Sequence, residues 1–152
     1  MPDHVAKSFV ATPNQFTTVN GRTLAYRSEG EGQPVLLCTR FRGTMDQWDP
    51  AFLDALVREG LRVVTFDYSG LGQSTGTPTY NPCEMAKDVS DLIQALELVD
   101  VAVGGWSLGG MVAQVALMND PERVSHLVLI GTTPPSGRSI VPGFPGRMVP
   151  GG

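Results

Sequence analysis

The chain has 152 residues, of which 41% are hydrophobic and 17% are charged, and its formal net charge is -4. This length and composition suit one folded domain and exclude an intrinsically disordered chain. The acidic balance, without any cluster of Lys and Arg, argues against a nucleic-acid-binding surface.

The first half of the chain predicts a β-hairpin followed by buried strands. Residues 15–19 and 23–27 are β-prone and are joined by Asn20-Gly21, a strong two-residue hairpin signal. Residues 34–38 form a continuous apolar run of the kind found in strands buried on both faces, and residues 61–66 form another. We therefore expect an antiparallel start followed by central strands.

Three amphipathic segments predict helices at residues 49–59, 81–98 and 109–118. Asp49 and Asn81 are N-cap residues by type, and each is followed by the proline that favours the first helical position. Apolar residues recur at helical spacing behind each cap, so each helix has one face to bury.

Two further strands are predicted at residues 101–103 and 124–130. Strands and helices then alternate along the chain, and parallel strands need helical crossovers. The fold class is therefore α/β, with a mostly parallel sheet, helices on both of its faces and the antiparallel hairpin at its start.

The last segment, residues 134–152, differs from the rest because ten of its nineteen residues are Pro or Gly and it has no hydrophobic periodicity. It predicts an irregular Pro/Gly-rich tail, a linker, or an artificial end created by truncation or frameshift. Residues 1–133 are left as the folded core.

Cys38 and Cys83 share no metal-ligand spacing, which favours buried reduced thiols over a disulfide or a metal site. We expect no metal and no cofactor. The N-terminus lacks the pattern of a secretory signal, and no apolar run approaches the length of a membrane span. These features predict a cytoplasmic protein with no membrane partner.

Ser107 lies in the stretch Gly105-Trp106-Ser107-Leu108-Gly109, which fits the pattern G-x-S-x-G. The predicted strand before it and helix after it place the serine at the carboxyl end of a strand, where open α/β sheets bind ligands. The glycines allow a sharp turn, and the following helix points its N-terminal amides toward a developing oxyanion. Ser107 is therefore a candidate nucleophile.

With these features the sequence resembles the α/β-hydrolase family from about residue 15 to residue 133, its amino-terminal portion. The serine turn is one part of the resemblance. The other parts are the hairpin start, the stretch Thr39-Arg40-Phe41-Arg42-Gly43 with Trp48 nearby, the turn at residues 66–74, and the stretch Pro121-Glu122-Arg123-Val124.

The resemblance implies that Ser107 is the nucleophile and that the amides of Phe41 and Leu108 form the oxyanion hole. The family usually has His-Gly before the first of these donors, whereas this chain has Thr39-Arg40. A backbone amide can donate whatever its side chain, but the loss of a glycine can change the loop. Trp106 either lines the acyl pocket, as a substrate-binding residue, or packs beneath the turn.

The acid and the histidine that should follow the nucleophile are missing from their expected places. After Ser107 the only carboxylates are Asp120 and Glu122, and the only histidine is His126. The topology assigns all three to the opposite edge of the sheet, beyond hydrogen-bond reach of the serine. His4 precedes the fold, and residues 131–133, the family's alternative acid position, contain no carboxylate.

Two hypotheses follow. The first is a serine α/β-hydrolase that cleaves an ester-type or related acyl bond of a small molecule through an acyl-enzyme on Ser107, of which this chain lacks the activating residues. The second is a non-catalytic truncated homologue that acts as a binding or interaction module, or a protein completed by a second chain. Residues 128–130 also predict an exposed apolar edge strand that favours self-association.

Overall fold

The computed structural model describes residues 8–135, which form a six-stranded sheet with strand order β1-β2-β4-β3-β5-β6. Strands β1 (Gln15–Val19) and β2 (Arg22–Glu29) form the predicted antiparallel hairpin. At its turn Asn20 and Gly21 have φ values of 45° and 82°. Two successive positive φ values are what a two-residue hairpin turn of this hand requires, so the turn residues explain the hairpin.

Four strands form the parallel part of the sheet: β3 (Gln33–Cys38), β4 (Leu61–Phe66), β5 (Val101–Trp106) and β6 (Val124–Ile130). β3 lies between β4 and β5, and β6 pairs with β5 alone. β2 joins this part by pairing antiparallel with β4. The predicted α/β fold class is confirmed, and β6 is an edge strand of the described sheet.

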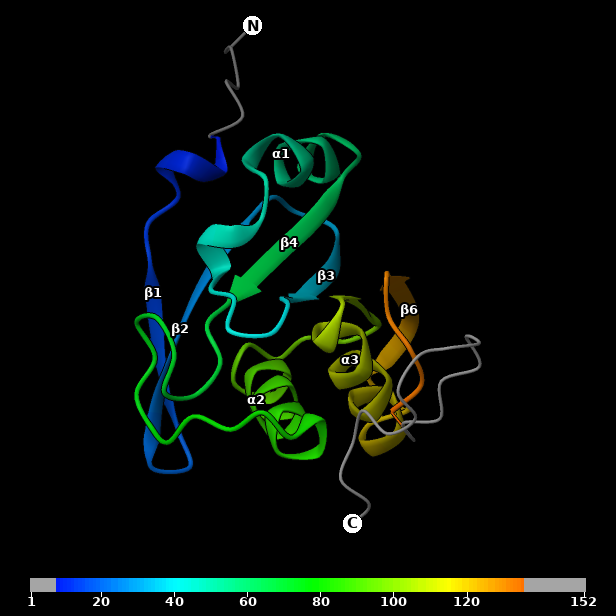
Figure 1. Ribbon diagram of the computed structural model, residues 1–152. Coiled ribbons are helices and arrows are strands. Elements are labelled where there is room, and N and C mark those ends of the chain that lie inside the picture. Colours follow the sequence, from blue (N-terminus) through cyan, green and yellow to red (C-terminus); the bar gives the residue numbers. More distant parts are fainter. Residues whose placement is uncertain (1–7, 136–152) are drawn as a thin grey trace, which may run out of the picture.

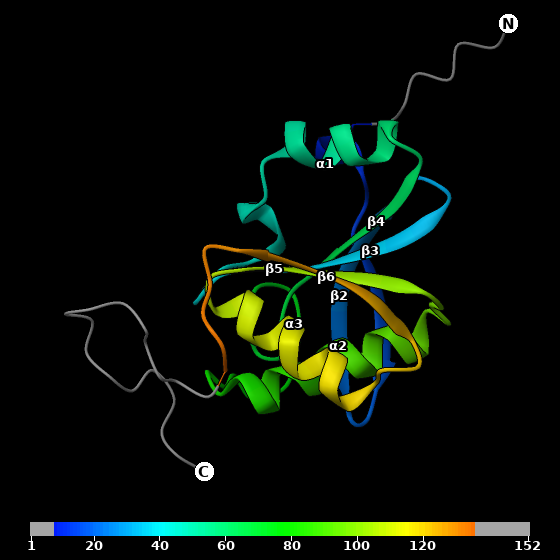
Figure 2. The ribbon, with the colours of Figure 1, turned by 90° about the vertical axis from the view of Figure 1, so that its right-hand side faces the viewer.

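The helices are α1 (Pro50–Arg58), α2 (Pro82–Ala95) and α3 (Leu108–Asn119). α1 covers one face of the sheet, and α2 and α3 cover the other, as Figure 2 shows with the sheet seen along its edge. Figure 1 shows the hairpin β1–β2 at one side of the sheet and β6 at the other. Helices therefore lie on both faces, as predicted.

The predicted caps determine where the first two helices begin. The Asp49 side chain accepts a hydrogen bond from the Ala51 amide, and the Asn81 side chain accepts one from the Cys83 amide. Short 3-10 turns at Phe9–Ala11 and Met45–Gln47 were not predicted. Such turns are too short to give a periodic signal in the sequence.

Two apolar cores hold the layers together. The larger lies between the sheet and the pair α2 and α3 and includes fully buried Leu36, Val64 and Leu92. The smaller lies under α1 and includes Trp48 and Leu53. Within residues 8–135, α1, the Phe9–Ala11 turn and Trp48 cover this face of the sheet, and an apolar groove lies beside β6.

A partly buried ion-pair cluster joins the hairpin to α2. Arg22 contacts Asp88 at 2.5 Å and Asp91 at 2.8 Å, and Asp88 also accepts from the Ser69 amide and hydroxyl. Burial by itself lowers the pKa of Arg22, but the hydrogen bonds and charges of the two aspartates leave that pKa raised overall. The cluster therefore fixes the β1–β2 hairpin against the helical layer.

The described residues bear on the predictions for the two cysteines, the tail and membrane spans. Both cysteines are free, but only Cys38 is buried, so the prediction of burial was wrong for Cys83, which lies exposed in the first turn of α2. The predicted tail at residues 134–152 falls outside the described residues from residue 136 onward, as does His4. Within residues 8–135, no helix is long and apolar enough to cross a membrane.

Candidate active site

Ser107 occupies the single residue between the end of β5 at Trp106 and the start of α3 at Leu108. Its backbone has φ 57° and ψ -121°, a combination that non-glycine residues rarely adopt. A residue held in such a conformation stores strain of about 1–3 kcal/mol, which the surrounding structure must impose. The predicted strained strand-to-helix turn is therefore present, and its serine side chain is exposed to solvent.

The two glycines of the pattern are required by close backbone contacts. A Cβ atom at Gly105 would overlap the carbonyl oxygen of Gly109, and a Cβ atom at Gly109 would overlap the carbonyl oxygen of Cys38. In both cases the obstacle is backbone, which cannot rotate away as a side chain can. The pattern G-x-S-x-G is thus explained by the packing of α3 against the ends of β3 and β5.

Hydrogen bonds from β6 and the segment after it hold the backbone of Ser107. Its amide donates to the Ile130 carbonyl at 3.0 Å, and its carbonyl accepts from the Thr132 hydroxyl at 2.6 Å. Thr132 also touches the helix, because a Cβ atom at Gly110 would overlap the Thr132 side chain. The sequence drew attention to this segment only for its lack of a carboxylate, and it did not predict the Thr132 contact.

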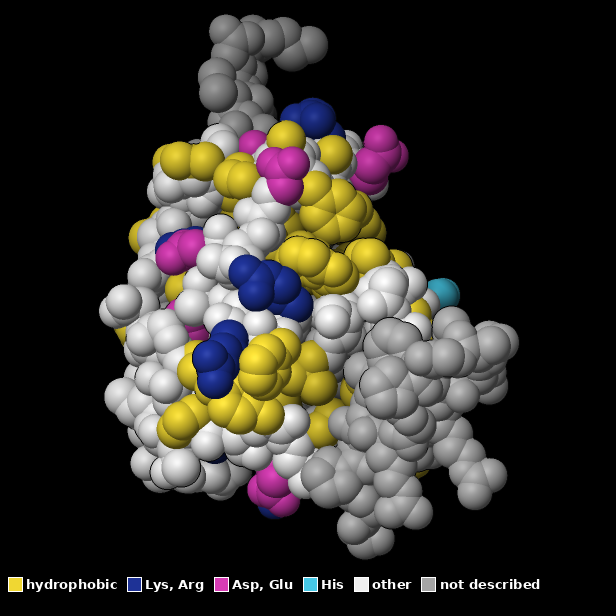
Figure 3. Space-filling view, in the orientation of Figure 1, with side chains coloured by type: hydrophobic (Ala, Val, Ile, Leu, Met, Phe, Trp, Pro, Cys, Tyr) yellow, Lys and Arg dark blue, Asp and Glu magenta, His cyan; other side chains and the backbone are white. Residues whose placement is uncertain are grey.

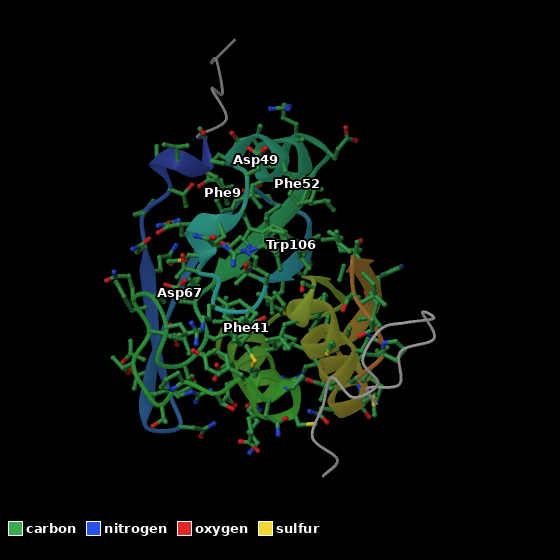
Figure 4. All side chains as sticks on the ribbon, viewed as in Figure 1. Phe9, Phe41, Asp49, Phe52, Asp67 and Trp106 are labelled. Carbon is green, nitrogen blue, oxygen red and sulfur yellow. The ribbon has the colours of Figure 1, made fainter. Side chains whose placement is uncertain are left out.

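A cavity of about 510 Å³ opens beside Ser107. Its walls combine the serine turn, the loop after β3 and the start of α2, and its lining residues are Phe41, Tyr80, Asn81, Pro82, Ser107, Leu108 and Met111. The structure therefore brings together Ser107, Phe41 and Leu108, the three residues that the sequence assigned to the chemical centre. Figure 4 shows Phe41 in the middle of this face, on the side of α2 and α3.

The amides of Phe41 and Leu108 have no hydrogen-bond acceptor in the part of the chain that the structure describes. Leu108 is the first residue of α3, where an N–H has no partner inside the helix. Free amides beside an exposed hydroxyl are the chemistry that stabilises a negatively charged oxygen.

Trp106 lies outside the lining of this cavity. Its ring centroid is 6.2 Å from that of Trp48, and the guanidinium carbon of Arg40 lies 5.8 Å from the Trp106 centroid. Figure 4 places Trp106 between Phe41 and the α1 layer. Of the two roles that the sequence left open for Trp106, the geometry favours packing beside the turn over lining the acyl pocket.

Two buried side chains at the end of β4 hold both ends of the loop that carries Phe41. The Tyr68 hydroxyl donates to the Thr39 carbonyl at 3.1 Å. Asp67, which is 2% exposed, accepts hydrogen bonds of 2.8 Å from the amides of Met45 and Gln73. These contacts fix the loop at Thr39 and at Met45.

Burial of Cys38 and Tyr68 next to this loop suppresses their ionisation. Burial raises the pKa of the Cys38 thiol to about 12 and outweighs the opposing effect of the Tyr68 hydroxyl. Burial, followed by the charge of Cys38 itself, raises the pKa of Tyr68 well above its ordinary value. Both groups are therefore neutral at physiological pH and act as structural supports of the loop.

None of the histidine or acidic side chains described after Ser107 reaches the cavity. His126 pairs with Ala102, five positions before Ser107, which at about 3.3 Å per residue places it roughly 16 Å away along the sheet. Its ring contacts Ser125 and Gln33, the first residue of β3. Asp120 and Glu122 lie at the same amino-end edge, in the turn between α3 and β6.

Comparison with known proteins agrees with this fold. A family model described as the alpha/beta hydrolase fold matches residues 33–149. A non-heme haloperoxidase of Rhodococcus erythropolis is 32% identical over 121 residues, which cover 78% of this chain and 44% of that protein. A pimeloyl-(acyl-carrier protein) methyl ester esterase of Aliivibrio fischeri is 34% identical over 112 residues, which cover 74% of this chain and 41% of that protein.

A solved structure also shares this fold. An alpha/beta hydrolase fold protein from Chitinophaga pinensis superposes with a TM-score of 0.82 at 32% sequence identity, covering 88% of this chain and 48% of that one. The chain spans less than half the length of the relatives described here. The family model matches this chain, and the serine turn lies at the end of β5. The chain therefore belongs to the family of proteins with the α/β-hydrolase fold.

Proposed function

We propose that this chain supplies the nucleophile and the oxyanion hole of a serine hydrolase that cleaves ester-type acyl bonds. The observation that carries the proposal is the strained conformation of Ser107, which points an exposed serine into a cavity shared with Phe41 and Leu108. The esterase named among the relatives supports an ester as the substrate class.

In the proposed reaction the Ser107 oxygen attacks the acyl carbonyl carbon while a general base takes the hydroxyl proton. The tetrahedral oxyanion accepts hydrogen bonds from the Phe41 and Leu108 amides, and the alcohol leaves with a proton returned by the base. Water then attacks the acyl-serine ester by the same route and releases the acid. Neither step of this proposed reaction requires a metal ion or a cofactor.

The base and its orienting acid belong to polypeptide other than residues 8–135 in this proposal. His126 and the carboxylates described after Ser107 lie at the far edge of the sheet, and the relatives are more than twice as long as the segments they share with this chain. A serine hydroxyl without a base is a weak nucleophile at neutral pH. The 152-residue chain alone is therefore expected to be nearly inactive.

A thiol at position 107 tests the nucleophile and the oxyanion hole without needing the missing base. Cysteine ionises appreciably by itself, so Ser107→Cys should be acylated by p-nitrophenyl acetate. We expect its acylation to be faster than that of the exposed Cys83, which does not line the cavity. A matched variant, Ser8→Cys, places a thiol at another exposed serine outside the cavity, and equal rates at all three thiols would reject the proposed oxyanion hole.

A second candidate function is that of an interaction module completed by a second chain. The specific observation in its favour is β6, an edge strand on which Val128, Leu129 and Ile130 are between 38% and 47% exposed. An apolar groove of about 390 Å³ runs beside the same strand, between it and α1. The thiol experiment separates the two candidates. A non-catalytic interaction module should not accelerate acylation at position 107, whereas a hydrolase should.

A further inference from the structure

Two arginines flank Phe41, which lines the cavity of Ser107, and neither is itself a lining residue: Arg42 stands against the aromatic wall of the cavity, and Arg40 lies over Trp106. The guanidinium carbon of Arg42 lies 5.2 Å from the Phe41 ring centroid and 5.8 Å from that of Tyr80, and both rings line the cavity. The rings themselves are 4.7 Å apart. Arg42 is held there with a φ of 56°, in the left-handed region that non-glycine residues avoid. The charge therefore stands directly against the aromatic wall of the site.

Neither arginine is neutralised by a carboxylate in the part of the chain that the structure describes. Arg40 donates to the Phe41 carbonyl at 3.2 Å and to the Gln47 side chain, and both are neutral acceptors. Arg42 is exposed, and within residues 8–135 it makes no hydrogen bond and no ion pair. By contrast, Arg22, Arg27 and Arg123 all pair with aspartates.

The helix ends and charged side chains beside the cavity favour a negatively charged ligand. The cavity lies at the N-terminal ends of α2 and α3, since Asn81, Pro82, Ser107 and Leu108 all line it, and helix N-termini carry partial positive charge. Its lining contains no carboxylate. Glu84, the acidic residue in the first turn of α2, is paired with Lys87 at 2.9 Å. This positive region is a local exception on a chain of net charge -4.

Figure 3 shows the same arrangement on the surface. Dark blue side chains stand beside the hydrophobic surface in the centre of this face, and the magenta acidic side chains lie mainly toward its margins. The apolar surface of this face therefore has basic side chains beside it.

We infer that the cavity of Ser107 selects esters that carry a second, anionic group, a carboxylate bound by Arg42, with Arg40 over Trp106 adding positive charge nearby. This inference rests on the proposed function and names its substrate class. The cavity volume of about 510 Å³ is that of a small-molecule site. Its apolar lining would take the carbon chain, and the planar guanidinium group of Arg42 matches the two oxygens of a carboxylate. A half-ester of a dicarboxylic acid has both features.

Equilibrium binding tests this inference without depending on turnover. Monomethyl adipate and dimethyl adipate share their chain and ester and differ in one negative charge at neutral pH. Calorimetric titration of the full chain should give at least roughly tenfold tighter binding of the monomethyl ester, with an advantage that shrinks as salt is added. The double variant Arg40→Gln, Arg42→Gln should bind the two esters equally.

Arg58→Gln is the matched control, because Arg58 is an exposed arginine at the end of α1, away from the cavity. It should leave the preference intact. Unchanged binding of dimethyl adipate shows that the double variant keeps its fold. A second control, Met111→Trp, fills the cavity and should weaken both esters.

The outcomes separate the inference from the proposed function. If both esters bind equally to the unaltered chain, or if the preference survives loss of both arginines, the inference is overturned and the ester site stands. If neither ester binds, or if binding is unaffected by Met111→Trp, the cavity is not an ester site, and the proposed function falls with the inference.

Discussion

The Tyr68 hydroxyl lies 3.1 Å from the Thr39 carbonyl oxygen and donates a hydrogen bond to it. Both residues are buried, with 1% of each exposed. Thr39 begins the loop that brings Phe41 to the cavity, so a tyrosine at the end of β4 fixes one wall of the candidate active site. This contact gives the first prediction.

Tyr68→Phe should lower the free energy of unfolding by about 1–3 kcal/mol, because the Thr39 carbonyl remains buried without its donor. Urea denaturation monitored by circular dichroism measures the change. Tyr80→Phe is the matched control, because Tyr80 is 43% exposed and its ring, which contacts Phe41, is retained. An equal effect of the two substitutions would mean that the Tyr68 hydroxyl does not hold the loop.

The buried thiol of Cys38 predicts a loss of stability in alkaline solution. Its folded pKa of about 12 lies above the ordinary value of 9.0, so the unfolded chain releases the proton first as pH rises. The contribution of Cys38 to the free energy of unfolding should therefore be constant below about pH 9 and fall by about 1.4 kcal/mol per pH unit between that pH and about pH 12. The raised pKa of Tyr68 acts in the same direction at the upper end of this range.

Urea midpoints at several alkaline pH values measure this slope. In Cys38→Ala the slope should be shallower than in the unaltered chain, whatever the substitution costs at neutral pH. Cys83→Ala, which alters an exposed thiol, should leave the slope unchanged. A Cys38→Ala variant with the full slope would assign the alkaline loss to other groups.

Gly109→Ala should prevent the native serine turn from forming, because its Cβ atom would overlap the backbone of Cys38. We expect a loss of several kcal/mol, at the upper end of the range for single substitutions. Gly104→Ala is the comparison, since a Cβ atom there meets chiefly the flexible end of the Leu37 side chain, at 2.9 Å. Thermal denaturation that ranks Gly104→Ala as the more damaging variant would contradict the packing described for α3.

Much of the fold was predictable because its signals are local. Asn20-Gly21 predicted the hairpin, and Asp49 and Asn81 predicted the helix starts, since each acts through its own backbone neighbours. The predicted end of β5 was wrong, because the strand was expected to stop at Val103 but continues to Trp106. Gly104 and Gly105 have low strand propensity, but pairing with Cys38, Val128 and Leu129 overrides it.

Part of the candidate site was predictable from chain order, and Phe41 from the family resemblance. Ser107 and Leu108 follow from one motif, and the remote edge assigned to His126 follows from strand direction. Tyr80 and Asn81 belong to a different loop, and no local pattern relates them to the serine. Thr132 acts through one side-chain hydrogen bond across the turn, which only tertiary packing determines.

The exposed edge of β6 predicts that the isolated chain self-associates at high concentration. Val128 and Ile130 face the α1 side of the sheet and line its apolar groove, while β6 has β5 as its only strand partner in the described sheet. Leu129→Lys should reduce the weight-average mass seen by sedimentation, because a charge on an edge strand opposes edge-to-edge pairing.

Val99→Lys controls for added charge, since Val99 is 68% exposed in the loop before β5 and lies outside β6. If both substitutions reduce association equally, net charge and not the β6 edge governs it. A chain that stays monomeric at all concentrations would show that the edge is protected.

The hydrolysis of p-nitrophenyl acetate by the 152-residue chain and by Ser107→Ala tests the central claim most directly. Because no general base among residues 8–135 reaches Ser107, we expect the same trace rate for both proteins and no burst of p-nitrophenol. A burst in the unaltered chain that Ser107→Ala abolishes would contradict this claim, because a base would then have to reach the serine from His126, from His4 or from a second copy of the chain.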